Sequence, residues 1–119
     1  MLSHVRWERA IAKFVLCDHP FTAFAAGERL LYVGCEYGGQ LAQLADRGCR
    51  AFGVDVRANV VAKCSARGLR VAVAAAEALP FRHHTMDGVV CKVVLPYTDE
   101  ARALTEIARV LASGGTLRV

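Results

Sequence analysis

Residues 30–39 read L-L-Y-V-G-C-E-Y-G-G, and this stretch decides the fold of the 119-residue chain. The apolar run Leu30–Val33 is typical of a short buried strand, and Gly34 ends that strand. A helix is predicted from Gly39 to Arg47, because glycine, here Gly48, is common just past a helix end. A strand that turns through glycines into a helix is the repeating unit of a parallel α/β sheet.

The same strand–helix order recurs along the chain about every 20 residues, as expected for a parallel sheet. Further strands are predicted at residues 49–55, 69–73, 88–93 and 116–119. Further helices are predicted at residues 59–67 and 99–111, the second with Asp99 as its N-terminal cap. Crossovers between parallel strands are right-handed, so helices are expected on both faces of a doubly wound α/β sheet.

An apolar stripe near the N-terminus predicts an additional helix. Trp7, Ile11, Phe14 and Val15 are spaced so that they share one helical face, and Pro20 ends the pattern. We therefore expect an N-terminal helical segment at residues 1–26 and one α/β domain at residues 27–119.

The composition indicates a folded domain with a substantial core. Hydrophobic residues make up 55% of the chain and charged residues 22%, which excludes the disordered and collagen-like classes. The net charge is +4, but the basic residues are scattered without a run of five like charges, so no specific nucleic-acid partner is predicted. The apolar stretches are shorter than the roughly 18 residues that a membrane span needs.

The cysteines predict reduced, buried thiols in a cytoplasmic protein. Their number is odd, and they stand singly without a C-x-x-C pair or a histidine at ligand spacing. Neither a disulfide framework nor a metal site is therefore expected. The cysteines are Cys17, Cys35, Cys49, Cys64 and Cys91.

A ligand site is expected where the glycine-rich stretch follows its strand. In open α/β sheets, ligands bind beyond the carboxyl ends of the strands, at the point where the strand order reverses. Gly34 allows a sharp turn there, and Gly38 and Gly39 let a ligand approach the backbone at a helix N-terminus. Asp55 ends the next predicted strand about 20 residues on, where a carboxylate can accept hydrogen bonds from ribose hydroxyls. The alternative for Asp55 is a cap on the following helix.

Two nucleotide-type ligands fit these residues. An NAD-binding G-x-G-x-x-G register would use Gly34 and Gly39 and would place Glu36 at the middle glycine, against the pyrophosphate. Burying that carboxylate against a phosphate is costly without a cation. S-adenosylmethionine instead carries a positive amino group and a positive sulfonium, so the charge of Glu36 favours this ligand.

Four stretches together resemble the class I S-adenosylmethionine-dependent methyltransferases, in particular the type 11 methyltransferase domain. They are L-L-Y-V-G-C-E-Y-G-G (30–39), G-V-D-V (53–56), A-E-A-L-P-F (76–81) and E-I-A-R-V-L-A-S-G-G-T-L (106–117). The resemblance implies a Rossmann-like, mostly parallel sheet of strand order 3-2-1-4-5 that lacks the family's usual last two strands. It also implies S-adenosyl-L-methionine as the cofactor and methyl transfer to an unidentified, small-molecule acceptor. The chain is expected to be a fragment, or to be completed at its fifth strand by a partner chain or a second copy.

The resemblance implies cofactor-binding residues in the glycine-rich loop. The loop around the methionine moiety matches Val33, Gly34, Cys35 and Gly38. Glu36 stands where the family has a glycine, and we expect it to replace an acid that the preceding strand lacks.

The resemblance also implies residues for the rest of the cofactor. The ribose-binding acid matches Asp55, with Val56 beside the adenine, and the adenine-edge segment matches Ala76 and Glu77. The position beside the transferred methyl, just after the fourth strand, matches Lys92, for which a surface position is the alternative because a cation is unfavourable near a sulfonium. No catalytic residue is predicted, because methyl displacement works largely by positioning and desolvation.

The sequence departs from the family's pattern at three positions. The family usually has an acid at Tyr32, a glycine at Glu36 and an aspartate at Ala75. Losing the two acids would weaken the hold on the ligand's amino group and adenine, each by roughly 1.5–3 kcal/mol. These departures keep open a second function, a non-catalytic binding or assembly module, and NAD binding is a third.

Overall fold

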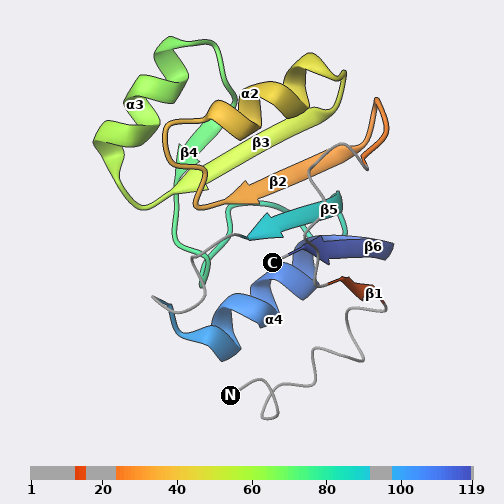
Figure 1. Ribbon diagram of the computed structural model, residues 1–119. Coiled ribbons are helices and arrows are strands. Elements are labelled where there is room, and N and C mark those ends of the chain that lie inside the picture. Colours follow the sequence, from red (N-terminus) through yellow and green to blue (C-terminus); the bar gives the residue numbers. More distant parts are fainter. Residues whose placement is uncertain (1–12, 16–23, 92–97, 119) are drawn as a thin grey trace.

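The computed structural model is built around one parallel sheet of six strands (Figure 1). It describes residues 13–15, 24–91 and 98–118. The strands are β1 (Lys13–Val15), β2 (Arg29–Val33), β3 (Arg50–Asp55), β4 (Val71–Val73), β5 (Met86–Cys91) and β6 (Leu111–Arg118). The helices are α2 (Gly39–Asp46), α3 (Ala58–Ala66) and α4 (Glu100–Val110).

The order across the sheet is β1-β6-β5-β2-β3-β4, and neighbouring strands pair in parallel. Counted from β2, the five predicted strands stand in the order 3-2-1-4-5, which confirms the predicted fold class. α2 and α3 lie on one face of the sheet and α4 lies on the other (Figure 1). The strand order reverses between β2 and β5, so their carboxyl ends flank the expected ligand position.

The alternation of side chains along the strands divides the core into two layers. In β2, Leu30 and Tyr32 pack in the layer that contains α2, whereas Leu31 and Val33 pack in the layer that contains α4. The residues predicted to face inward from the last helix are all buried, and they are Ala103, Leu104, Ile107, Val110 and Leu111.

The ends of the helices follow the predicted signals. α2 and α3 are each followed by a glycine whose N–H donates to a carbonyl of the last turn, Gly48 to Ala45 (3.0 Å) and Gly68 to Ser65 (2.9 Å). α4 begins at its predicted cap, because an Asp99 Oδ1 accepts a hydrogen bond from the N–H of Arg102 at 3.3 Å. These local signals operate within a few residues of sequence, which is why they could be predicted.

The boundary of β6 differs from the prediction. The predicted strand starts at Thr116, but β6 begins at Leu111, directly after α4. Met86 pairs with Leu111 while Gly88 pairs with Thr116, so the intervening residues of β6 form a bulge. The Ser-Gly-Gly stretch at residues 113–115 is therefore part of the strand, because β5 pairs with β6 before and after it.

The prediction of a helix across residues 1–26 is wrong for Lys13–Val15, which form β1. This strand pairs in parallel with Thr116–Arg118 of β6. The prediction that the fifth strand has an unpaired edge is wrong for the same reason, and this edge needs no partner chain at these residues. An open strand edge presents a row of unpaired N–H and C=O groups, and pairing them outweighs the helical pattern of the segment. The other residues of the predicted helix lie outside the described residues, and the division at residue 26 stays a prediction.

The irregular segment between β4 and β5 is anchored on α4. Glu106 accepts a hydrogen bond from the N–H of Leu79 at 2.8 Å, and Arg109 donates to the carbonyls of Leu79 (2.9 Å) and Phe81 (2.8 Å). Arg109 also forms an ion pair with Glu106, with 2.6 Å between Nε and Oε2. Three backbone groups of a segment without secondary structure are thus satisfied by one pair of helical side chains.

Candidate functional site

The loop between β2 and α2 folds back over the end of β3. The N–H groups of Gly34 and Cys35 both donate to the carbonyl of Val54, at 2.8 and 3.0 Å. Gly34 and Gly38 have φ values of 76° and 82°, a left-handed conformation that costs glycine little. The predicted turn is therefore present, and it carries the chain from the carboxyl end of β2 to the start of α2.

A side chain at Gly38 would be strained and crowded in this loop. A Cβ there would lie 2.6 Å from Leu69 Cδ1 and 3.1 Å from Cys64 Sγ, both of which face the loop from α3 and the segment after it. A Cβ at Gly39 would meet nothing within 4 Å. The two neighbouring glycines thus differ: the first is required by packing, and the second leaves the N-terminus of α2 open.

α3 holds the backbone of this loop in place. The thiol of Cys64 donates to the carbonyl of Glu36 (3.2 Å), and Arg67 Nη1 donates to the carbonyl of Tyr37 (2.6 Å). Lys63 Nζ lies 5.5 Å from the centre of the Tyr37 ring. The sequence analysis gave none of these residues a role in the loop, because their contacts join segments about 30 residues apart in the chain.

Asp55 occupies the place expected for the ribose-binding acid. Its side chain is 4% exposed at the carboxyl end of β3, and it is the only buried charged residue among those described. One oxygen, Oδ2, accepts a hydrogen bond from the N–H of Glu36 at 3.1 Å, so the acid touches the glycine-rich loop directly. The other oxygen, Oδ1, accepts one from the N–H of Arg57 at 3.0 Å.

The guanidinium of Arg57 also binds Asp55. Its Nε lies 3.0 Å from Oδ1 and its Nη2 lies 3.1 Å from Oδ2, which makes a two-pronged ion pair. Burial by itself raises the pKa of Asp55, but the hydrogen bonds from Arg57 and Glu36 outweigh it and lower the pKa below its ordinary value. The carboxylate is therefore charged at neutral pH. The alternative role for Asp55, a cap on the next helix, is wrong, because Arg57 holds the N-cap position of α3 and Asp55 accepts the N–H of that residue, ahead of the helix.

Tyr32 and Glu36 lie near each other at the mouth of the loop. Tyr32 is buried, and its hydroxyl donates to Oε1 of Gln40 in the first turn of α2. Burial raises the pKa of Tyr32 to about 12, and the charge of Glu36 adds to the shift. Glu36 itself is exposed. The charge of Glu36 therefore acts on Tyr32, the position at which the family usually has its acid.

Two further residues predicted for the loop are buried in the core. Val33 is 1% exposed and packs in the α4 layer, and Cys35 is 6% exposed and packs in the α2 layer. Burial is the largest cause that raises the pKa of the Cys35 thiol to about 12. Cys35 is therefore no nucleophile at neutral pH. Four cysteines, all but Cys17, are described, and each is a buried free thiol.

The residues predicted to lie beside the adenine fall into two groups. Val56 is 66% exposed directly after β3, and the exposed Val73 ends the neighbouring strand in register with Asp55. Ala76 is buried, and Glu77 Oε2 accepts a hydrogen bond from the N–H of Asp99 at 3.0 Å. Glu77 thus helps to join the segment after β4 to the start of α4, a role that the sequence analysis missed. Lys92 lies outside the described residues.

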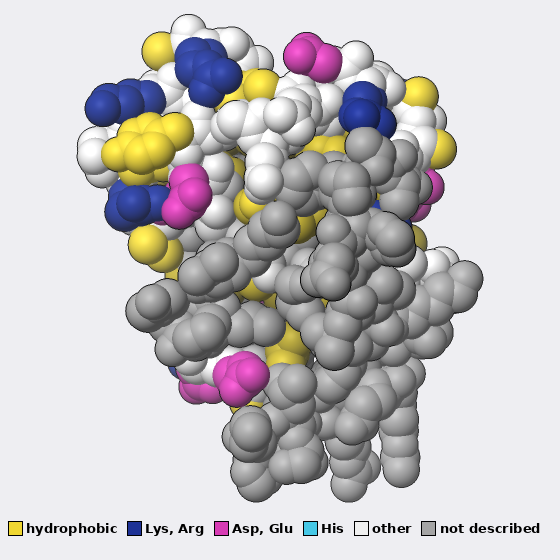
Figure 2. Space-filling view, viewed as in Figure 1, with side chains coloured by type: hydrophobic (Ala, Val, Ile, Leu, Met, Phe, Trp, Pro, Cys, Tyr) yellow, Lys and Arg dark blue, Asp and Glu magenta, His cyan; other side chains and the backbone are white. Residues whose placement is uncertain are grey.

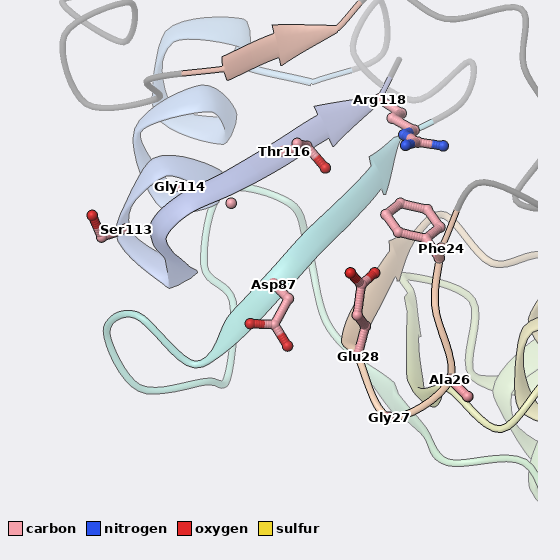
Figure 3. A pocket seen from close by; sticks show the side chains of 10 residues that line it. Phe24, Ala26, Gly27, Glu28, Asp87, Ser113, Gly114, Thr116 and Arg118 are labelled. Carbon is pink, nitrogen blue, oxygen red and sulfur yellow. The ribbon is translucent and has the colours of Figure 1, made fainter.

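A pocket of about 540 Å³ lies elsewhere, beside the amino-terminal ends of β2 and β5 (Figure 3). Glu28, Asp87 and Thr116 line it, and at its far end the guanidinium of Arg118 stacks on the ring of Phe24, 4.1 Å from its centre. Sequence reasoning placed no residue of this pocket in a site. It had no signal to use, because the pocket arises from three segments that meet only in the folded chain.

The face drawn in Figure 2 shows no single basic patch in the described part of the chain. On the face drawn in Figure 2, the Lys and Arg side chains of the described part are separated by acidic, hydrophobic and uncharged groups. Within the same residues, no group of three or more His, Cys, Asp or Glu side chains could hold a metal ion. None of the helices in that part is long and apolar enough to cross a membrane.

Comparison with solved structures finds the same fold in proteins about twice as long. The methyltransferase from the complex with the Haloferax volcanii Trm112 methyltransferase activator is 26% identical, with a TM-score of 0.72, over 98% of this chain and 52% of that one. The [4+2]-cyclase SpnF is 25% identical, with a TM-score of 0.68, over 89% of this chain and 39% of that one. A TehB-like SAM-dependent methyltransferase from Corynebacterium glutamicum shares the fold at 20% identity, with a TM-score of 0.71, over 81% and 56%.

The family comparison agrees with the motifs and with the sheet. A family model described as "Methyltransferase domain" matches residues 31–119, which begin in β2 and include the glycine-rich loop and Asp55. The strand order and the position of the loop are those that the resemblance implied. The chain belongs to the methyltransferase domain family.

Proposed function

We propose that the chain binds S-adenosyl-L-methionine and serves methyl transfer to a small-molecule acceptor. The observation that carries this proposal is the buried, ionised Asp55, which is hydrogen-bonded to the backbone of the glycine-rich loop. A carboxylate held at the carboxyl end of β3 suits the hydroxyls of a ribose. The cofactor, when bound, supplies a methyl group on a positively charged sulfur.

The residues around Asp55 fit such a ligand. In this proposal the loop from Gly34 to Gly38 takes the methionine end, and the exposed Val56 covers one side of the adenine. The carboxylate of Glu36, whose charge acts on Tyr32, offers a partner for a positive amino group. The same negative charge would repel the pyrophosphate of NAD. This charge arrangement favours S-adenosylmethionine over NAD.

Other residues have supporting roles in the proposed site. We assign Ala76 and Glu77 to the adenine edge, and Lys92, which lies outside the described residues, to the position beside the methyl group. The proposal assigns no side chain as a catalytic base. The proposed contribution of the chain is therefore to hold the methyl group in line with the acceptor and to exclude water.

A non-catalytic module is the second candidate. The family's usual acid is replaced by Tyr32, whose hydroxyl is engaged with Gln40, and the similar SpnF is named as a cyclase. Membership of the family therefore does not by itself fix the reaction. Binding of the cofactor is the property that separates the two candidates.

Calorimetric titration tests the proposal directly. We expect micromolar binding of S-adenosylmethionine and S-adenosylhomocysteine and no binding of NAD. Asp55→Ala should weaken binding about ten- to a hundredfold, because two charge-assisted hydrogen bonds to the ribose are lost. The matched control is Asp46→Ala, which removes an exposed aspartate at the end of α2 and should leave the affinity unchanged. Binding of none of the three ligands would favour the second candidate, the non-catalytic module. Binding of NAD alone would contradict S-adenosylmethionine as the ligand.

The location is proposed from the thiols. Four free, buried cysteines are stable in a reducing compartment, which favours the cytoplasm.

A further inference from the structure

We propose that the guanidinium of Arg57 blocks the ribose-binding carboxylate of Asp55 in the free protein. The guanidinium must move away from Asp55 when the ligand binds. The inference rests on the proposed function, since it concerns the same Asp55 carboxylate. It adds an arginine that neither the motifs nor the resemblance assigned to the site.

The first step is a count of acceptor positions on Asp55. A carboxylate has about four lone-pair sites, two on each oxygen. Oδ1 accepts hydrogen bonds from the N–H and the Nε of Arg57, both at 3.0 Å. Oδ2 accepts hydrogen bonds from the N–H of Glu36 and from Nη2 of Arg57, both at 3.1 Å. All four sites are filled, so no ribose hydroxyl can donate to Asp55 while the guanidinium is in place.

The second step is to ask which of the four donors can leave. The N–H groups of Glu36 and Arg57 belong to the backbone of the loop and of the start of α3, and they stay with the fold. The Arg57 side chain is 49% exposed, and it makes no hydrogen bond to cap α3. The guanidinium can therefore move into water without leaving a buried group unpaired.

The third step is the geometry that remains after the guanidinium leaves. Each oxygen of Asp55 keeps one backbone N–H and gains one free acceptor position. Two free positions, one on each oxygen, match the two neighbouring hydroxyls of a ribose. The backbone N–H groups hold the carboxylate in the same orientation, so Arg57 competes with the ligand but does not build the site.

This competition predicts that removing the arginine strengthens binding. We would titrate the chain with S-adenosylhomocysteine and compare Arg57→Ala with the parent protein. The arginine in this ion pair is half exposed, so it is a weak competitor and the dissociation constant should fall by about two- to fivefold. Arg57→Ser removes the same guanidinium and adds a good helix N-cap, and it should show the same gain if Arg57→Ala folds poorly. The control Arg102→Ala removes an equal charge from an exposed position of α4 on the other face and should change nothing.

A second measurement follows the arginine itself. In proton–nitrogen NMR spectra of the free protein, the Nε–H signal of Arg57 should be protected from exchange, and it should lose this protection in the S-adenosylhomocysteine complex. An unchanged or weaker affinity in both Arg57 variants, or a protected Nε–H in the complex, would overturn the inference while leaving the proposed function intact. Failure of the parent protein and of every variant to bind would overturn the proposed function and this inference together.

Discussion

Glu36 shows at the scale of one residue how the loop combines backbone and side-chain roles. Its φ is 51°, a left-handed conformation that costs a residue with a side chain about 1–2 kcal/mol. Its N–H donates to Asp55 and its carbonyl accepts from Cys64, so both backbone groups are held in this conformation. The exposed carboxylate is then free to face a ligand.

The first prediction at this scale concerns that carboxylate. Glu36→Gln should weaken the binding of S-adenosylmethionine about tenfold, because a charged partner of the amino group becomes neutral while the backbone contacts stay. Calorimetry measures the change, with Glu100→Gln on α4 as a control that removes an equal charge elsewhere. Equal affinities for Glu36→Gln and the parent protein would show that Glu36 does not replace the missing acid.

The second prediction concerns the paired glycines. Gly38→Ala should lower the free energy of unfolding by about 1–2 kcal/mol from its left-handed backbone alone, and by more because the new Cβ approaches Leu69 Cδ1 to 2.6 Å. Gly39→Ala is the matched control, since its Cβ meets nothing within 4 Å and alanine is the better helix residue. Urea unfolding measures both. Equal losses for the two variants would contradict the packing role of Gly38.

Among the elements, α4 has a role beyond covering one face of the sheet. Its Glu106 and Arg109 bind the backbone at Leu79 and Phe81, and Glu77 returns a contact to the N–H of Asp99. These contacts fix the segment after β4, which carries the predicted adenine-edge residues. We therefore expect a change on α4 to reach the segment that is proposed to hold the adenine edge.

The prediction for this element is that Arg109→Lys destabilises the chain by about 1–3 kcal/mol. A lysine ammonium cannot reach Glu106 and the carbonyls of Leu79 and Phe81 at once, as the planar guanidinium does. Urea unfolding measures the loss, and Arg102→Lys, an exposed position of the same helix, is the control. A loss of similar size in both variants would mean that the anchoring contacts do not matter.

For the whole molecule, three carboxylates link stability to pH. Hydrogen bonds from Arg29 lower the pKa of Asp87, and those from Arg109 lower the pKa of Glu106. For Asp55, burial opposes the shift, but the hydrogen bonds from Arg57 and Glu36 outweigh it. Groups with lowered pKa values bind fewer protons in the folded chain than in the unfolded chain.

The contribution of these carboxylates to the free energy of unfolding should therefore be present above about pH 4, their ordinary pKa. It should be lost as the pH falls through their pKa values in the folded chain. Urea unfolding at a series of pH values between neutral and acid measures this. Asp87→Asn should flatten the dependence in part, because one of the three groups no longer titrates. A stability that rises on acidification would contradict the assigned directions.

The sequence by itself determined the parts of the molecule that depend on near neighbours. The strand of Leu30–Val33, the helix ends at Gly48 and Gly68 and the cap at Asp99 follow from short patterns, and the resemblance to the methyltransferase family implied the strand order. The positions of the glycine-rich loop and of Asp55 at the carboxyl ends of adjacent strands follow from that order. Apolar periodicity and glycine positions are local properties, so the amino-acid sequence is enough to reveal them.

Only the tertiary structure decided the contacts between distant segments. The sequence did not show that Lys13–Val15 pairs with β6 instead of continuing a helix, because the partner edge is about 100 residues away. It did not show that the guanidinium of Arg57 donates hydrogen bonds to the Asp55 carboxylate. It also did not show that Cys64 and Arg67 donate hydrogen bonds to the glycine-rich loop, since side-chain direction decides these contacts. Hydrogen-bonding groups must find partners wherever the fold brings them, and this requirement is met in space and not along the chain.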